Sequence, residues 1–281
     1  MKDAPPAGQP AASKAHAPAD PDGPPETAGT HAGRISGETG TTGVVGVVLA
    51  GGRSSRLGED KARLRLGPRK KYGSPNAVCP APADRPGREW AGHDWIGRER
   101  TGPDMLTRTL RLLRACTDDV AVSCQSSRDV RPWRRIPDER EGMGPIGAIC
   151  SILRAEQRPV LVLSCDLPFM TGQVLRRLLA ARAARPSDAL MTVFRQTETG
   201  YIEPLVAVYE PACRPWFEAA VAAGKRRLGN VIPESLRACV PYGREEALPF
   251  FNINYPADLE AARLLAEHRA HKGSGEGDPG E

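Results

Sequence analysis

The stretch from Val44 to Lys61 constrains the fold more than any other part of the sequence. It begins with Val-Val-Gly-Val-Val-Leu-Ala, an apolar and mostly β-branched run of strand length, which stops at Gly51-Gly52. The loop that follows carries Arg53 and Arg56 and closes with Lys61. Glycines let backbone N–H groups curl around anionic oxygens, and the cations add attraction. The stretch predicts a strand that ends in a phosphate-binding turn, although a plain surface turn has the same composition.

Two familiar phosphate-binding motifs do not fit this turn. A Walker loop requires Gly-Lys followed by Ser or Thr at the start of a helix, and a dinucleotide fingerprint requires Gly-x-Gly-x-x-Gly. Neither pattern occurs in the stretch. If the turn binds a nucleotide, it does so in another way.

Strand-like and helix-like patterns alternate along the rest of the chain. Strand patterns cover residues 119–123, 135–138, 160–164, 189–194 and 202–209, and residues 250–256 read as extended. Helical patterns cover residues 104–115, 146–156, 172–185, 211–223 and 257–268, and a further short helix begins within 230–236. The alternation predicts an α/β protein with a doubly wound, mostly parallel sheet. The short connection 195–200 predicts an antiparallel addition, whose second strand is interrupted at Glu203-Pro204.

One folded domain with additions accounts for the length of 281 residues and a hydrophobic content of 40%. We expect this domain to cover residues 43–268. Residues 1–42 are rich in Pro, Ala and Gly and are expected to form a disordered tail, with a second tail over 269–281. The segment 68–103 has no periodicity and is expected to be an irregular insertion.

Charge, hydropathy and cysteine content bear on partners and location. The net charge is +5, and the 39 basic residues are scattered, so we expect no nucleic-acid partner. The longest apolar run, 44–50, is far shorter than the roughly twenty residues of a membrane helix, so no membrane association is expected. The seven cysteines form no Cys-x-x-Cys pair, which indicates reduced thiols in a cytoplasmic protein.

Several predicted strands end in small or charged residues that can form one site. The ends lie after Ala50, Ser123, Asp138 and Ser164. Ligands of open α/β sheets bind at the carboxyl ends of strands, where the winding direction changes. Asp166 follows a fully apolar strand, where an uncompensated carboxylate is costly unless it holds a cation. Its alternative role is to cap the segment that follows.

The run from Leu49 to Lys61 resembles the signature Leu-Ala-Gly-Gly-x-x-x-Arg-Leu/Met-Gly-x-Asp-Lys of nucleotidyltransferases, most closely that of molybdenum cofactor guanylyltransferases. The resemblance extends from Val44 to Ala266, apart from the insertion. It implies a Rossmann-like fold of the nucleotide-diphospho-sugar transferase type. It also implies transfer of GMP from GTP to the phosphate of Mo-molybdopterin, which releases pyrophosphate and forms the guanine dinucleotide cofactor. A molybdopterin cytidylyltransferase, a sugar-1-phosphate nucleotidyltransferase and a non-catalytic nucleotide-binding protein of the same fold are the alternatives.

The resemblance implies roles for the residues that match the family. It assigns Mg²⁺ to Asp166 and catalysis to Lys61, Arg56 and Asp166. The nucleotide-binding residues that it implies are Leu49, Ala50, Gly51, Gly52, Lys61, Ser123, Asp138 and Asp166. The acceptor-binding residues are Asn252, Asn254, Arg226 and Arg227. Each set has a structural alternative: a turn residue at Asp138, amides that cap the final helix, and a basic helix cap.

Two positions bear on the choice of nucleotide. Ser123 stands where the family usually has an asparagine, and its shorter hydroxyl reaches a nucleotide through water or not at all. Gly51 stands where cytidylyl relatives have alanine, which favours GTP over CTP, although a positive φ is another reason for a glycine. The partners that the resemblance implies are GTP, Mo-molybdopterin, and molybdenum-insertion and molybdoenzyme maturation proteins.

Overall fold

The computed structural model describes residues 43–51, 57–67, 102–125, 127–139 and 142–273. The predicted tail 1–42, residues 274–281, nearly all of the predicted insertion 68–103, and Gly52, Arg53 and Arg56 lie outside these residues. The strands of the described part are β1 (Val45–Leu49), β2 (Asp119–Cys124), β3 (Arg134–Pro137), β4 (Val160–Ser164), β5 (Met191–Gln196), β6 (Ile202–Tyr209) and β7 (Arg237–Tyr242). Its helices are α1 (Met105–Arg114), α2 (Gly144–Ala155), α3 (Gly172–Ala183), α4 (Arg214–Ala222) and α5 (Pro256–Gly273).

The strands form one sheet in the order β3-β2-β1-β4-β6-β5-β7. β6 runs antiparallel to both of its neighbours, and the other strand pairs of the described sheet are parallel. The chain winds from β1 outward to β3 and then returns to the other side of β1 at β4. Such a reversal opens a crevice at the carboxyl ends of β1 and β4. The predicted doubly wound sheet and its antiparallel addition are confirmed.

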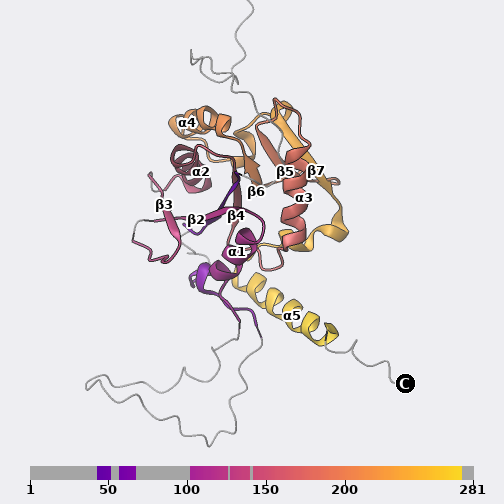
Figure 1. Ribbon diagram of the computed structural model, residues 1–281. Coiled ribbons are helices and arrows are strands. Elements are labelled where there is room, and N and C mark those ends of the chain that lie inside the picture. Colours follow the sequence, from indigo (N-terminus) through magenta and orange to yellow (C-terminus); the bar gives the residue numbers. More distant parts are fainter. Residues whose placement is uncertain (1–42, 52–56, 68–101, 126, 140–141, 274–281) are drawn as a thin grey trace, which may run out of the picture.

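Strand residues alternate between the two faces of the sheet, and each face is covered by two helices (Figure 1). Val45 and Val47 of β1 pack in a core with α2 and α4, whereas Val44 and Val48 pack in a core with α1 and α3. Gly46 allows α1 to lie close to β1, because a Cβ atom there would be 3.0 Å from a side chain of that helix. The sheet is therefore the central layer of three.

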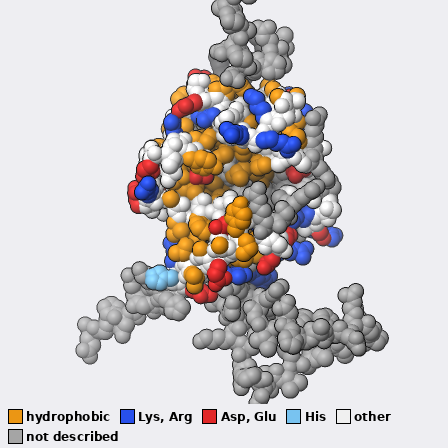
Figure 2. Space-filling view, turned by 180° about the vertical axis from the view of Figure 1, so that it is seen from behind, with side chains coloured by type: hydrophobic (Ala, Val, Ile, Leu, Met, Phe, Trp, Pro, Cys, Tyr) orange, Lys and Arg blue, Asp and Glu red, His pale blue; other side chains and the backbone are white. Residues whose placement is uncertain are grey.

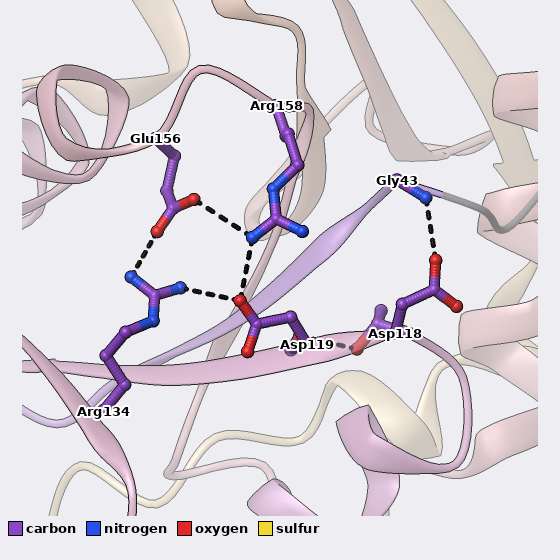
Figure 3. A network of polar contacts seen from close by, with 7 residues as sticks. Gly43, Asp118, Asp119, Arg134, Glu156 and Arg158 are labelled. Carbon is purple, nitrogen blue, oxygen red and sulfur yellow. Dashed lines mark hydrogen bonds and ion pairs between the residues drawn. The ribbon is translucent and has the colours of Figure 1, made fainter.

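An ion-pair network joins the strands at their amino ends (Figure 3). Asp119, at the start of β2, pairs with Arg134 of β3 at 3.1 Å and with Arg158, just before β4, at 2.8 Å. Both arginines also pair with the buried carboxylate of Glu156. Burial acts to raise the pKa of Asp119, but the hydrogen bond from Arg158 and the charge of Arg134 lower it below its usual value. This network stabilises the sheet at the edge opposite the strands' carboxyl ends.

A third, smaller core joins α5 to the loops at the carboxyl ends of the strands. Its buried side chains are Leu57, Leu64, Met105, Phe169, Ile253, Leu259 and Ala262. Pro256 begins α5, as predicted, and the Asp258 carboxylate accepts hydrogen bonds from the backbone N–H groups of Asn254 and Tyr255. The helix extends away from the body (Figure 1) and continues to Gly273, so residues 269–273, predicted as tail, are helical.

Several local predictions differ from the structure. β7 was not predicted, because Arg-Ala-Cys-Val-Pro-Tyr has weak alternation and contains a proline, which an edge strand tolerates. Of residues 250–256, predicted as extended, Phe250 ends a 3₁₀ turn and Pro256 already begins α5, whereas 251–254 have no regular secondary structure. In place of a helix within 230–236 there are two 3₁₀ turns, Leu228–Asn230 and Glu234–Leu236. β6 runs through Glu203 and Pro204 without the predicted interruption, and its pairing with β5 shifts register between Val193 and Arg195.

The surface seen from behind carries hydrophobic side chains near its centre, with Lys and Arg side chains above them (Figure 2). This face thus offers apolar contact area beside positive charge. A helix able to cross a membrane, which needs both length and an apolar sequence, does not occur in the described part of the chain.

Candidate active site

The carboxyl ends of β1, β2 and β4 lie side by side in matching register. Leu49, the last residue of β1, lies opposite Ser123 on β2 and opposite Ser164 on β4. The backbone N–H of Ala50 donates to the carbonyl of Ser123 at 2.9 Å, and that of Cys165 donates to the carbonyl of Leu49 at 3.4 Å. Leu49 and Ala50 therefore lie at the centre of this edge, at the topological switch point.

A lysine, an aspartate and an asparagine from distant parts of the sequence meet at this edge. The Lys61 ammonium donates to Asp166 Oδ2 at 3.1 Å and to Asn254 Oδ1 at 2.9 Å. The side chains of Lys61 and Asp166 are only 18% and 12% exposed. Partial burial lowers the effective dielectric constant, so the cation and the carboxylate act strongly on a ligand placed beside them. The structure thus brings together three of the predicted site residues.

The loop after β4 holds Asp166 in place. The Ser164 hydroxyl donates to Asp166 Oδ1 at 2.5 Å, and the backbone N–H of Ile253 donates to the Asp166 carbonyl at 3.0 Å. Arg108 of α1 reaches across and donates to the carbonyl of Met170 at 2.5 Å. Burial lowers the pKa of Arg108, whose donors are directed at carbonyls of this loop. Ser164 and Arg108 were missed from the sequence because their role depends on contacts between distant segments.

The turn that carries Lys61 is fixed by the residue before it. Asp60 caps the 3₁₀ turn Lys61–Arg63, its Oδ1 accepting a hydrogen bond from the backbone N–H of Ala62 at 3.1 Å. Its Oδ2 pairs with Arg128, from the loop after β2, at 2.9 Å. The turn is therefore tied to the neighbouring strand loop, which limits where the Lys61 ammonium can lie.

Asp138, Ser123 and Gly51 form a second group at the same edge. The buried Ser123 hydroxyl donates to Asp138 Oδ1 at 2.8 Å. A Cβ atom at Gly51 would lie 2.7 Å from Asp138 Oδ2, and the backbone of Gly51 does not have a positive φ. This glycine is therefore required by the close approach of the Asp138 carboxylate and not by backbone conformation.

The two asparagines beside α5 have different environments. Asn254 binds Lys61, whereas Asn252 Oδ1 is buried without a hydrogen-bond partner in the described part of the chain. Ile253 between them is completely buried in the third core. A buried acceptor without a donor is costly, so Asn252 is suited to accept a hydrogen bond from a ligand.

Arg226 and Arg227 lie apart from these groups. Both are exposed in the turn after α4, and Arg226 donates to the carbonyl of Gly142, just before α2, at 2.7 Å. Among the described residues, neither arginine contacts Lys61, Asp166 or Asn254.

The cysteines near the site are buried thiols with raised pKa values. Cys165 is adjacent to Asp166, and burial, followed by the charge of Asp166, raises its pKa to about 12. Burial also raises the pKa of Cys124, at the end of β2. The six described cysteines form no disulfide bonds with one another. In the part of the chain that the structure covers, three or more His, Cys, Asp or Glu side chains do not gather as a metal site.

Fold and site define the class of the protein: a nucleotidyltransferase with a doubly wound sheet and a lysine–aspartate pair at the switch point. The chain belongs to the MobA-like NTP transferase domain family, which residues 84–238 match. A probable molybdenum cofactor guanylyltransferase from Chloroflexus aggregans is 30% identical over 232 residues, which are 76% of this chain and 91% of that protein. A second, from Pelotomaculum thermopropionicum, is 27% identical over 235 residues, 79% of this chain and 93% of that protein.

A crystal structure supports the same fold. Molybdopterin-guanine dinucleotide biosynthesis protein A from Archaeoglobus fulgidus aligns with a TM-score of 0.56 and 22% identity, covering 80% of this chain and 99% of that one. The family match and the relatives confirm the resemblance predicted from the loop Leu49 to Lys61, although that loop precedes the residues that match the family.

Proposed function

We propose that the protein transfers GMP from GTP to the phosphate of Mo-molybdopterin and releases pyrophosphate. The relatives named molybdenum cofactor guanylyltransferase support this substrate pair. The observation that carries the proposal is the contact of Lys61 with Asp166 at the carboxyl ends of β1 and β4, where phosphates bind in such sheets. A protein that only bound nucleotides would have little use for this pair.

In this reaction, the residues of the protein stabilise charge on the phosphates and orient the reacting groups. The acceptor phosphate attacks the α-phosphorus of GTP in line, so no protein nucleophile is needed. Lys61 moves from Asp166 to the phosphate oxygens that gain charge in the transition state, and Asn254 orients its ammonium. Arg56, in the same loop, supplies further positive charge to the phosphates.

Asp166 is the residue that we propose to hold Mg²⁺. Its carboxylate is partly buried at the phosphate-binding edge, and Mg²⁺ is commonly bound by one or two carboxylates together with substrate phosphates. A Mg²⁺ ion held by this carboxylate would neutralise part of the negative charge on the triphosphate. Ser164 keeps the carboxylate in the orientation that this requires.

We assign the two substrates to opposite sides of Asp166. GTP lies over Leu49, Ala50, Gly51 and Gly52, with Asp138 beside the base and Ser123 acting on the nucleotide through Asp138. The acceptor lies over Asn252 and Asn254, and Arg226 and Arg227 attract its phosphate from the rim. Because β2 and β3 lie beyond β1 and β6 lies beyond β4, this arrangement follows the order of the strands.

We also propose which part of the chain is catalytic, in which compartment it acts and which proteins it works with. Residues 43–268 form the catalytic domain, and the flanking segments are not needed for the reaction. The cytoplasm is the compartment that the free cysteines favour. Molybdenum-insertion and molybdoenzyme maturation proteins would supply the acceptor and receive the product.

Pyrophosphate release with each of four nucleoside triphosphates tests the proposal. The protein is incubated with Mg²⁺ and molybdopterin, and separately with Mg²⁺ and a sugar 1-phosphate. We expect release that requires both GTP and molybdopterin. Release only with CTP, or only with the sugar phosphate, would select one of the alternative transferases, and nucleotide binding without release would select a non-catalytic protein.

A further inference from the structure

Glu203 lies at the functional edge of the sheet but has no role in the reaction described so far. β6 is antiparallel to β4, with Val206 opposite Leu163, so the first residues of β6 lie beside the carboxyl end of β4 and its Asp166. The register shift between β5 and β6 falls at this start: Ala207 lies opposite Val193, but Ile202 lies opposite Arg195. Irregularities of this kind next to active sites redirect side chains.

The Glu203 carboxylate is held by a buried tyrosine. Tyr242, the last residue of β7, donates its hydroxyl hydrogen to Glu203 Oε1 at 2.6 Å, across the end of β5. The second oxygen, Oε2, has no hydrogen-bond partner among the described residues. It is accessible to solvent, because it is absent from the fully buried unpaired atoms. Burial raises the pKa of Glu203, and the bond from Tyr242 opposes this shift. The structure thus presents one oriented acceptor oxygen in a partly buried position.

An exposed aromatic ring and a second acceptor accompany this oxygen. Tyr201, just before β6, is 59% exposed, and its pKa is raised by partial burial and by the nearby charge of Glu203. The Tyr242 ring packs against Phe250 at 4.3 Å, and two residues further lies Asn252, whose Oδ1 is buried and unpaired. A flat ring beside acceptor oxygens suits a planar heterocycle that carries adjacent N–H donors.

We infer that Glu203, oriented by Tyr242, binds the N–H edge of the acceptor's pterin ring, with Tyr201 against the ring face. The inference rests on the proposed function. Guanine has the same kind of N–H edge, so Glu203 could bind either guanine or the pterin. The order of the strands favours the pterin. The Asp138 carboxylate lies against Gly51, just after β1, whereas Glu203 begins β6, two positions from β1 in the sheet, which corresponds to roughly 10 Å at the usual strand spacing. Asp166 lies between them, so phosphates at Asp166 leave one heterocycle on each side.

The test compares Glu203→Gln with wild type in equilibrium binding of molybdopterin alone and of GTP alone. The amide keeps the shape and an acceptor for Tyr242 but loses the negative charge. We expect the Kd for molybdopterin to rise by roughly 10- to 100-fold, the usual effect of losing a charged hydrogen bond, and the Kd for GTP to stay unchanged. Glu234→Gln is the matched control, because Glu234 is exposed and, within the described part of the chain, pairs with Arg195 on β5; it should change neither value.

Each other outcome is decisive. An unchanged molybdopterin Kd in folded Glu203→Gln protein would overturn the inference, and a weaker GTP Kd instead would mean that Glu203 binds guanine. If Glu203→Gln does not fold, Tyr201→Leu replaces it, because the exposed ring contributes little to the core. Its molybdopterin Kd should also rise, and an unchanged value would reject the subsite. Failure of the wild type to bind molybdopterin would instead refute the proposed function.

Discussion

Replacement of Gly51 by alanine tests how the edge of the sheet binds the nucleotide. The new methyl group would lie 2.7 Å from Asp138 Oδ2, whereas ordinary contacts of a Cβ atom begin near 3.4 Å. The carboxylate must therefore shift by several tenths of an ångström, which breaks or distorts its 2.8 Å hydrogen bond from Ser123. A disrupted buried hydrogen bond costs about 1–3 kcal/mol.

We therefore expect Gly51→Ala to lower kcat/KM for GTP by roughly 5- to 150-fold, and to lower that for CTP less. The assay is pyrophosphate release at limiting nucleotide, with molybdopterin saturating. Because the new methyl group acts by displacing the Asp138 carboxylate, Gly51→Ala should cause little further loss of kcat/KM in a protein that already carries Asp138→Ala. A double-mutant cycle measures this coupling. Strictly additive losses would refute the reasoning.

Gly58→Ala is the control for backbone strain in the same loop. Gly58 has a φ of +75°, and a Cβ atom there would meet no atom within 4 Å. Alanine at this position strains the backbone by about 1–2 kcal/mol without touching Asp138. Its effect should be the same with GTP and CTP and independent of Asp138. Equal losses for GTP and CTP in Gly51→Ala would show that this glycine does not discriminate between bases.

Three further substitutions test the site and the scaffold. Asp166→Ala should lower turnover by a factor of about 10² to 10³ or more while the thermal unfolding temperature stays near that of the wild type, and near-normal pyrophosphate release would contradict its role. Glu210→Ala should destabilise the fold by about 3–5 kcal/mol in urea unfolding, because Arg182, which is only 14% exposed and binds both carboxylate oxygens, and Arg185 both lose this partner; a loss below 1 kcal/mol would contradict this. Asp119→Asn should destabilise by at most about 1 kcal/mol at neutral pH, since the pairs are partly exposed. The pKa of Asp119 is lowered in the folded state, so its contribution to stability is fully present above about pH 4. This contribution is lost as the pH falls through the lowered pKa. A loss of stability in Asp119→Asn that does not depend on pH would argue against ion pairing.

The strands and helices that line the site could be predicted because their sequence patterns are simple. Val160–Ser164 is a continuous apolar run, and the structure has β4 at those residues. α1 was predicted from helical periodicity, and its N-cap is Asp104, whose carboxylate accepts a hydrogen bond from the backbone N–H of Thr107. Such elements are determined by local periodicity and by burial of one or both faces.

The parts that could not be predicted depend on contacts between distant segments. β7 contains a proline and little alternation, and it forms because β5 offers a free edge. The contact between Lys61 and Asn254 joins residues that are 193 positions apart, and the proximity of Gly51 to Asp138 also depends on the fold. The sequence alone left open whether Gly51 is a glycine because its backbone has a positive φ. The structure answers this, because the φ of Gly51 is not positive.

The fate of the α-phosphorus of GTP is the most direct test of the account. The protein is incubated with Mg²⁺, molybdopterin and GTP labelled at either the α- or the γ-phosphorus, and the pterin product and pyrophosphate are separated. The account predicts that the α label enters the pterin product, that the γ label leaves only in pyrophosphate, and that Asp166→Ala stops both. An unlabelled pterin product, a γ label in that product, or labelling from CTP in preference to GTP would contradict it.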